Sequence, residues 1–133
     1  MNKNQNVLLV DNDEDDLILL TEALQECVVF DKYNFAYNGR EALDYLKNTS
    51  VLPELIFLDI NMHIMNGIEF LSIIKSDLLF KKIPVIILST STNPHEIEQT
   101  LRLGAKSYIS KPDNYEDLKS ILMKLLHEFR FPD

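Results

Sequence analysis

The chain has 133 residues, of which 46% are hydrophobic and 26% charged, with a formal net charge of −8 at pH 7. This length suits one globular domain with a buried core, and the composition excludes a disordered chain. The negative charge opposes the electrostatic attraction on which nonspecific nucleic-acid binding depends, so we expect no nucleic acid as partner. No apolar run approaches the roughly 20 residues that cross a bilayer, so we expect a cytoplasmic protein without a membrane partner.

Five β-strands are expected, separated by longer segments of helical period, which is typical of a parallel sheet covered by helices. In chain order they lie at residues 7–10, 34–37, 55–58, 85–88 and 107–109. The first, third and fourth of these runs are continuously apolar. Central strands need this pattern because helices cover both of their faces. These three strands are therefore the predicted core of the sheet.

A helix is predicted after each strand, from apolar residues that recur with helical spacing. The first and fifth helices are marked by two apolar stripes: Leu17, Leu20 and Leu24, and Leu118, Ile121, Leu122 and Leu125. The second, third and fourth are expected at residues 40–47, 68–78 and 94–103. Asn93 can cap the fourth helix, Pro94 suits its first position and Gly104 stops it. Five strand–helix pairs with right-handed crossovers predict a doubly wound α/β fold.

Functional residues of a doubly wound sheet lie beyond the carboxyl ends of its strands. The first strand is followed by an acidic run at residues 11–16, where a phosphate-binding loop would need glycines and amide donors. We assign Asp13 to Asp16 to capping the next helix and complementing its dipole. Asp11 differs, because it ends a buried strand where an unpaired charge is costly. It therefore needs a cation.

The ends of the third, fourth and fifth strands supply groups of complementary chemistry. Asp59 ends the third strand, and its repulsion with Asp11 must be relieved by protonation or a metal. We expect Mg²⁺, bound by these two carboxylates, by a backbone carbonyl near Asn61 and by water. Ser89 ends the fourth strand, and Lys111 supplies a positive charge after the fifth. Together these residues are typical of a site that anchors a phosphoryl group on a carboxylate nucleophile with Mg²⁺.

With these motifs, the sequence resembles response-regulator receiver domains, including single-domain types such as the chemotaxis regulator. The best-matching segment is PELIFLDINMHIMNGIEFL at residues 53–71, and PVIILSTS and GAKSYISKP follow at suitable distances. The resemblance runs from about residue 6 to about residue 128. It implies one receiver domain over residues 1–133 with a five-stranded, doubly wound, flavodoxin-like sheet of strand order 2-1-3-4-5, the (βα)5 arrangement of CheY.

The resemblance implies a phosphoacceptor site built on Asp59. Asp59 would attack a phosphohistidine of a histidine kinase or a histidine phosphotransfer protein, with Mg²⁺ stabilising the developing charge. The implied Mg²⁺ ligands are Asp11, Asn12, Asp59 and Asn61, the last through its carbonyl. Lys111 is the implied cation that contacts the phosphoryl group. The chain is thus expected to be a signalling phosphoacceptor and not an enzyme, with slow autodephosphorylation at most.

The resemblance also implies how the signal leaves the site. Ser89 is the implied switch hydroxyl that hydrogen-bonds the phosphoryl group, and Tyr108 is the aromatic residue that follows it. Their movement reshapes the face made by the fourth helix, the fifth strand and the fifth helix, which a downstream protein target reads. The oligomeric state, including a homodimer, is left open. The peptide bond before Pro112 is implied to be cis.

Two positions depart from the family pattern. Asn12 stands where the family has a second acidic residue, so we expect weaker Mg²⁺ binding. His63 stands where the loop after the acceptor commonly has proline. The first departure leaves an alternative open, namely a phosphorylation-impaired pseudo-receiver that serves as a protein-binding module.

A third interpretation is an enzyme with the same doubly wound sheet, either flavodoxin-like or phosphatase-like. The acidic run at residues 11–16 opposes the binding of a flavin phosphate, because like charges repel. A phosphatase of this kind has a second aspartate two residues after the first, and Asn61 stands there instead. Both observations favour the signalling interpretation.

Overall fold

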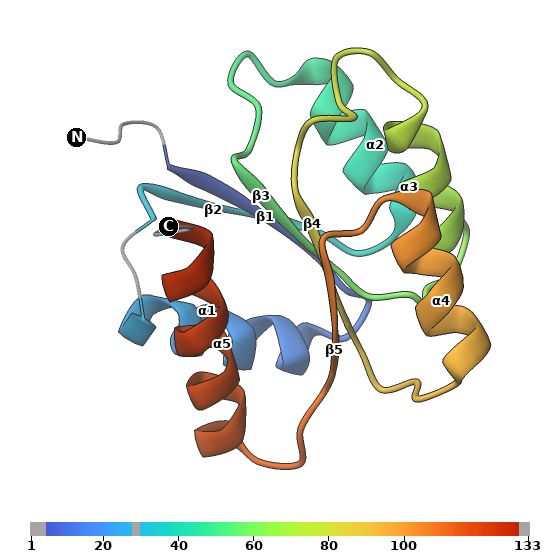
Figure 1. Cartoon of the computed structure of the whole chain (residues 1–133). Coiled ribbons are helices and arrows are strands. Elements are labelled where there is room, and N and C mark those ends of the chain that lie inside the picture. The colour runs from blue at the N-terminus through green and yellow to red at the C-terminus, as the bar shows by residue number, and fades with distance from the viewer. Residues whose placement is uncertain (1–4, 28–29, 131–133) are drawn as a thin grey trace.

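The computed structural model describes residues 5–27 and 30–130. In this part of the chain, five parallel strands form one sheet with the order β2-β1-β3-β4-β5 (Figure 1). The strands are β1 (Asn6–Val10), β2 (Lys32–Ala36), β3 (Leu55–Leu58), β4 (Val85–Ser89) and β5 (Ser107–Ser110). The predicted doubly wound α/β fold and its strand order are confirmed.

A helix follows each strand in the described part of the chain. The helices are α1 (Glu14–Cys27), α2 (Gly39–Asn48), α3 (Gly67–Lys75), α4 (Pro94–Leu103) and α5 (Tyr115–Arg130). Helices α1 and α5 lie together on one face of the sheet, and α2, α3 and α4 cover the other (Figure 1). None of them, as far as the chain is described, combines the length and apolar character that crossing a membrane requires.

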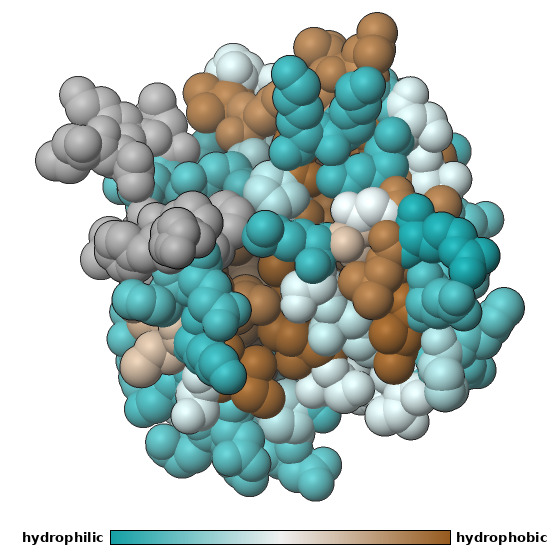
Figure 2. All heavy atoms as spheres, viewed as in Figure 1, coloured by the Kyte–Doolittle hydropathy of each residue, from teal (hydrophilic) through white to brown (hydrophobic). Residues whose placement is uncertain are grey.

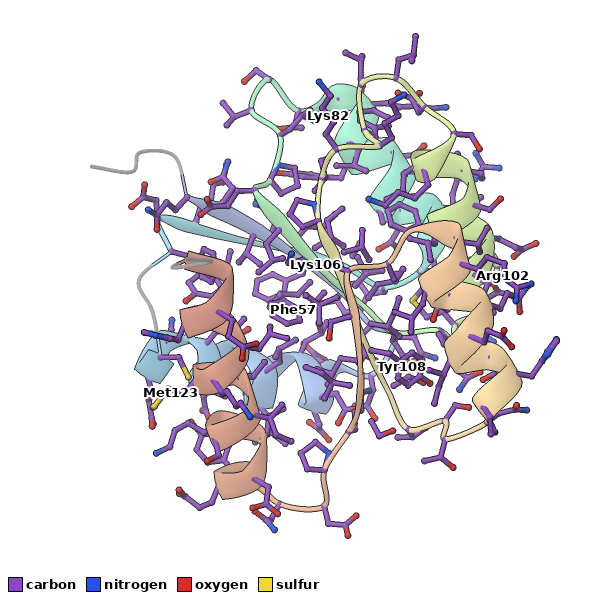
Figure 3. All side chains as sticks on the ribbon, viewed as in Figure 1. Phe57, Lys82, Arg102, Lys106, Tyr108 and Met123 are labelled. Atoms are coloured by element: carbon purple, nitrogen blue, oxygen red, sulfur yellow. The ribbon has the colours of Figure 1, made fainter. Side chains whose placement is uncertain are left out.

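The hydrophobic core lies in one layer on each face of the sheet. Alternate residues of β1 divide between these layers, because Val7 and Leu9 pack with α1 and α5, whereas Leu8 and Val10 pack with α2 and α3. Phe57 of β3 belongs to the first layer and lies between the sheet and α5 (Figure 3). Burial on both faces explains the continuously apolar strands, since each fully buried side chain of this size contributes about 1.5–3 kcal/mol.

Helix α4 has the predicted bounds because both of its ends carry a strong local signal. The Asn93 side chain accepts a hydrogen bond from the His95 amide, and Pro94 occupies the first helical position. Gly104 ends the helix with a φ of 119°, a left-handed conformation that glycine adopts without steric cost. Capping residues therefore fix this element more sharply than its apolar pattern does.

Strand β2 begins and ends earlier than the predicted range of 34–37. Pairing with β1 starts where Lys32 lies opposite Asn6, so the neighbouring strand sets the beginning. The amide of Tyr37 donates to Glu41 Oε1 at 2.8 Å. This amide therefore bonds to the first turn of α2 and not to a neighbouring strand. The strand prediction failed here because it followed side-chain character, whereas backbone pairing decides the register.

Helix α3 ends at Lys75 and not near residue 78 as predicted. The side chain of Asp77 accepts hydrogen bonds from the amides of Leu79 and Phe80, at 2.7 and 3.2 Å. An aspartate that binds nearby amides in this way offers the backbone an alternative to the helix. The apolar residues that follow lie in the turn and are not part of the helix.

Candidate functional site

Residues from the ends of β1, β3 and β5 meet at the carboxyl edge of the sheet. Asp11 follows β1, Asp59 follows β3 and Lys111 follows β5. The amide of Asp59 donates to the Val10 carbonyl at 2.9 Å, and the amide of Asp11 donates to the Ala36 carbonyl at 3.0 Å. Both carboxylates are therefore held in place by an extension of the sheet's own hydrogen bonding.

The ammonium group of Lys111 lies among carboxylates. Its Nζ atom is 2.7 Å from Asp11 Oδ2, 2.8 Å from Asp16 Oδ2 and 4.0 Å from Asp59 Oδ2. Asp11 and Asp59 are only 5% and 7% exposed. The structure thus brings together the three residues selected from the strand ends, and it adds Asp16 from the first turn of α1.

The electrostatics of this cluster leave Asp59 short of positive charge. The pKa of Asp59 is raised from 3.8 to about 6, mainly because burial raises it. The charge of Lys111 opposes this rise, the neighbouring Asp11 adds to it, and the amides of Ile60 and Asn61 oppose it. Burial also acts to lower the pKa of Lys111, but the hydrogen bonds to Asp11 and Asp16 and the charge of Asp59 outweigh this, so the pKa of Lys111 is raised. Lys111 therefore stays charged. The Asp59 carboxylate has no cation within hydrogen-bonding distance among the described residues and can bind another cation or react with an electrophile.

The backbone around Asp59 is closely packed against the start of α3. A Cβ atom at Gly67 would collide with the carbonyl oxygen of Asp59. The amide of Gly67 donates to the Ile60 carbonyl at 2.9 Å, and the neighbouring Asn66 caps α3 in a capping box with Glu69. The residue at position 67 must lack a side chain so that the loop after β3 can return over the backbone of Asp59.

Ser89 and Tyr108 are connected through the loop after β4. Ser89 is fully buried, and its Oγ atom accepts a hydrogen bond from the amide of Ser91 at 3.2 Å. The hydroxyl of half-buried Tyr108 donates to the carbonyl of the same Ser91 at 2.8 Å, and Figure 3 shows Tyr108 reaching from β5 toward α4. Ser91 therefore connects the two predicted switch residues through hydrogen bonds of its backbone. It was not predicted from the sequence.

Asn12, Asn61 and His63 lie at the mouth of the site. They line an open hollow of about 350 Å³ together with residues that include Glu96 of α4. Asn12 and Asn61 are exposed, unlike the buried Asp11 and Asp59. The structure therefore places Asn12 next to the buried Asp11 and open to solvent.

The donor set of the cluster fits a hard divalent cation. Asp11 and Asp59 offer buried carboxylate oxygens, and Asn12 and Asn61 offer neutral oxygens at the mouth. Oxygen ligands of this kind suit Mg²⁺, whereas thiols and imidazoles suit softer metals. Within the described residues, no group of three or more His, Cys, Asp or Glu side chains could hold a metal by itself. A metal would therefore depend on amide or backbone oxygens as well as on the two carboxylates.

Asp16 is the member of the ion cluster that sequence reasoning missed. The acidic residues after Asp13 were assigned together to the dipole of α1. A finer signal was present, because Asp16 precedes Leu20 and Leu24 by one and two helical turns, and both leucines are buried. A carboxylate on the buried stripe of a helix faces the interior and needs a partner.

The peptide bond between Lys111 and Pro112 is trans, because no cis bond occurs among the described residues. The expectation of a cis bond here is wrong. The trans form of an X–Pro bond is favoured by about 0.5–1 kcal/mol in the absence of other constraints. The amide of Lys111 still donates to the Ser89 carbonyl at 2.8 Å, which ties the residue to the end of β4.

Comparison with known proteins decides the family. The sequence model of the response regulator receiver domain matches residues 7–123. The chain belongs to the response regulator receiver domain family. As a receiver domain, it carries the fold and the cluster of strand-end residues that support a phosphoacceptor role in two-component signalling.

Receiver domains similar to this chain are known from sequence and structure. Response regulator Rcp1 of Synechocystis is 31% identical over 117 residues, covering 84% of this chain and 80% of Rcp1. The structure of a Mn²⁺-bound form of Rcp1 has a TM-score of 0.83 at 28% identity and covers 91% of each chain. The phosphorylated cyanobacterial phytochrome response regulator RcpA has a TM-score of 0.87 at 34% identity and covers 96% of this chain and 94% of RcpA.

Other relatives contain a receiver domain as part of a longer protein. A protein-glutamate methylesterase/protein-glutamine glutaminase of Methanococcoides burtonii is 38% identical over 98 residues. The match covers 71% of this chain and only 26% of that protein. The likeness therefore concerns the receiver portion, a signalling switch, and does not extend to the esterase activity.

Proposed function

We propose that this chain is the phosphoacceptor switch of a two-component phosphorelay, with Asp59 as the residue that is phosphorylated. The observation that carries the proposal is the partly buried Lys111 ammonium, 2.7 Å from Asp11 and 4.0 Å from Asp59 at one edge of the sheet. The phosphorylated state of the similar RcpA supports it. The donor would be a phosphohistidine on a histidine kinase or a histidine phosphotransfer protein.

The chemistry follows from the charges around Asp59. With a pKa of about 6, Asp59 is mostly ionised at neutral pH and can attack phosphorus. A bond forms between a carboxylate oxygen and phosphorus, and the phosphorus–nitrogen bond of phosphohistidine breaks with its electron pair leaving on the imidazole. Lys111 stabilises the charge that develops on the phosphoryl oxygens. Mg²⁺, if held by Asp11, Asp59 and oxygens of Asn12 and Asn61, would supply further charge neutralisation there.

The switch would act through Ser91. A phosphoryl group that draws the Ser89 hydroxyl toward itself moves Oγ away from the Ser91 amide, from which Oγ now accepts a hydrogen bond at 3.2 Å. Displacing Ser91 disturbs its carbonyl, which is the partner of the Tyr108 hydroxyl at 2.8 Å. This chain of contacts joins the acceptor to β5, so one added group can bias two arrangements of the same face.

The face made by α4, β5 and α5 is the proposed output surface. Apolar atoms gather on it between the two helices, on either side of β5 (Figure 2). Leu101 of α4 is 44% exposed. Exposed apolar side chains of this size suit contact with a downstream protein target or with a second copy of the chain.

The pseudo-receiver is retained as a second candidate because Asn12 is neutral and exposed where the family pattern has an acidic residue. It would use the same face without phosphorylation.

Two further expectations stay predictions. One is a single receiver domain over residues 1–133 with a core of about 6–128, and the other is a cytoplasmic location.

Beryllofluoride, a phosphoryl mimic, distinguishes the two candidates. Amide NMR spectra are recorded with the mimic in the presence and absence of Mg²⁺. A phosphoacceptor switch gives Mg²⁺-dependent shifts at Asp59, Ser89, Ser91 and Tyr108, and the Asp59→Asn variant gives none. A silent spectrum from the native chain would favour the pseudo-receiver, and Asn12→Asp should then restore the shifts.

A further inference from the structure

The resting position of Lys111 is set by two carboxylates, and neither of them is the proposed acceptor. Its Nζ atom is within hydrogen-bonding distance of Asp11 and Asp16, at 2.7 and 2.8 Å, but 4.0 Å from Asp59. We propose that Asp16 is a positioning residue that holds the Lys111 ammonium and competes with a phosphoryl group on Asp59 for its charge. This inference rests on the proposed function of Asp59.

The distances show which partner Lys111 favours. Coulomb energy falls as the inverse of separation, so the attraction at 4.0 Å is about 30% weaker than at 2.8 Å. The shorter contacts are also charge-assisted hydrogen bonds, which the longer one is not. Lys111 has three N–H donors, and Asp11 and Asp16 occupy two of them. Only the remaining donor is available to Asp59.

Asp16 is oriented toward Lys111 by the fold, and is not merely one of several nearby acids. It lies one turn before buried Leu20, and with Lys111 and Leu20 it lines a cavity of about 110 Å³ between α1 and the segment after β5. Asp15, its neighbour in the same helical turn, is exposed.

Phosphorylation changes the balance of this competition. A phosphoryl group on Asp59 carries more negative charge than the carboxylate, and it brings oxygen acceptors toward the ammonium. The carboxylate of Asp16 then withdraws charge and hydrogen bonding that the phosphorylated state requires. Removing the charge of Asp16 should therefore favour the phosphorylated state over the resting one.

The test compares Asp16→Asn with Asp15→Asn. Both substitutions remove one negative charge from the first turn of α1, and only the first removes a partner of Lys111. Affinity for beryllofluoride is measured with saturating Mg²⁺. We expect Asp16→Asn to raise it about fivefold, the equivalent of about 1 kcal/mol for a half-exposed ion pair, and Asp15→Asn to leave it unchanged. An equal effect of both variants, or a loss of affinity in Asp16→Asn, would overturn the proposal.

A second measurement tests the resting contact without the mimic. The ¹⁵N resonance of the Lys111 ammonium should be sharp in the native chain and in Asp15→Asn, and shifted or broadened in Asp16→Asn. An unchanged resonance would refute the positioning role, whatever happens at Asp59. Conversely, if the native chain fails to bind beryllofluoride while Asp16→Asn still shifts or broadens the Lys111 resonance, the proposed function is refuted and the position of Lys111 is established.

Asp16→Glu is the conservative control for charge. Its carboxylate can still reach the ammonium, so it should keep both the native affinity and the native resonance. If it behaved like Asp16→Asn, the charge of Asp16 would not be the cause and the proposal would be wrong.

Discussion

Replacing Asp59 with asparagine should stabilise the metal-free protein at neutral pH. Burial and the nearby Asp11 raise the pKa of Asp59 from 3.8 to about 6, although Lys111 opposes this shift. The folded state therefore binds a proton more tightly than the unfolded state, and stability falls as pH rises from about 3.8 through about 6. The asparagine side chain of the variant has no charge to desolvate in either state.

The size of the effect follows from the pKa change. The rise from 3.8 to about 6 corresponds to about 3 kcal/mol at 1.36 kcal/mol per pKa unit. Screening by solvent at the open side of the site reduces this value. We therefore expect the free energy of unfolding of Asp59→Asn at pH 7 to exceed that of the native chain by about 1–2 kcal/mol. At pH 3.5, where Asp59 is mostly protonated in both states, the two proteins should be nearly equal in stability.

Urea unfolding of both proteins with a chelator present, at pH 7 and pH 3.5, measures the difference through the midpoint at constant m. Adding Mg²⁺ at pH 7 should stabilise the native chain and leave Asp59→Asn unaffected. A variant that is less stable than the native chain at pH 7, or a difference that does not depend on pH, would refute the conclusion that burial of the ionised Asp59 carboxylate destabilises the fold.

Three further predictions concern the packing around the site and use the same unfolding measurement. Ile64→Gly should stabilise by about 1 kcal/mol, because Ile64 is 81% exposed and has a φ of 68° that a β-branched residue adopts at a cost; a lower urea midpoint would contradict this. Gly67→Ala should destabilise by about 1–3 kcal/mol or more, since its Cβ meets the Asp59 carbonyl; native stability would show that the loop yields. Phe57→Ala should cost about 3–5 kcal/mol through a core cavity, and a loss below about 1 kcal/mol would indicate a less packed core than described.

The sequence predicted those parts of the fold that local chemistry decides. The apolar runs of β1, β3 and β4 and the capping residues around α4 led to the observed elements, because burial on two faces and cap geometry leave direct marks on the sequence. β2 was displaced, since pairing with β1 sets its register and leaves no such mark. α3 was predicted too long because the side chain of Asp77 redirects the backbone.

The site was also predicted in part. Asp11, Asp59 and Lys111 could be selected because parallel strands deliver their carboxyl ends to one edge. Asp16 was missed because its role as a helix-terminal acid was sufficient to explain it, and only its alignment with buried Leu20 suggested otherwise. Ser91 could not be found in advance, because its amide and carbonyl make the contacts and its side-chain type gives no signal.

The central claim is that Asp59 is the residue that receives the phosphoryl group. The most direct measurement is mass spectrometry of the intact chain and its peptides after incubation with a small phosphodonor and Mg²⁺, beside the Asp59→Asn variant and Asn12→Asp. The account predicts one phosphoryl group on Asp59, none on the asparagine variant, and faster labelling in Asn12→Asp. Labelling that persists without Asp59, or its absence from the native chain and from Asn12→Asp alike, would contradict it.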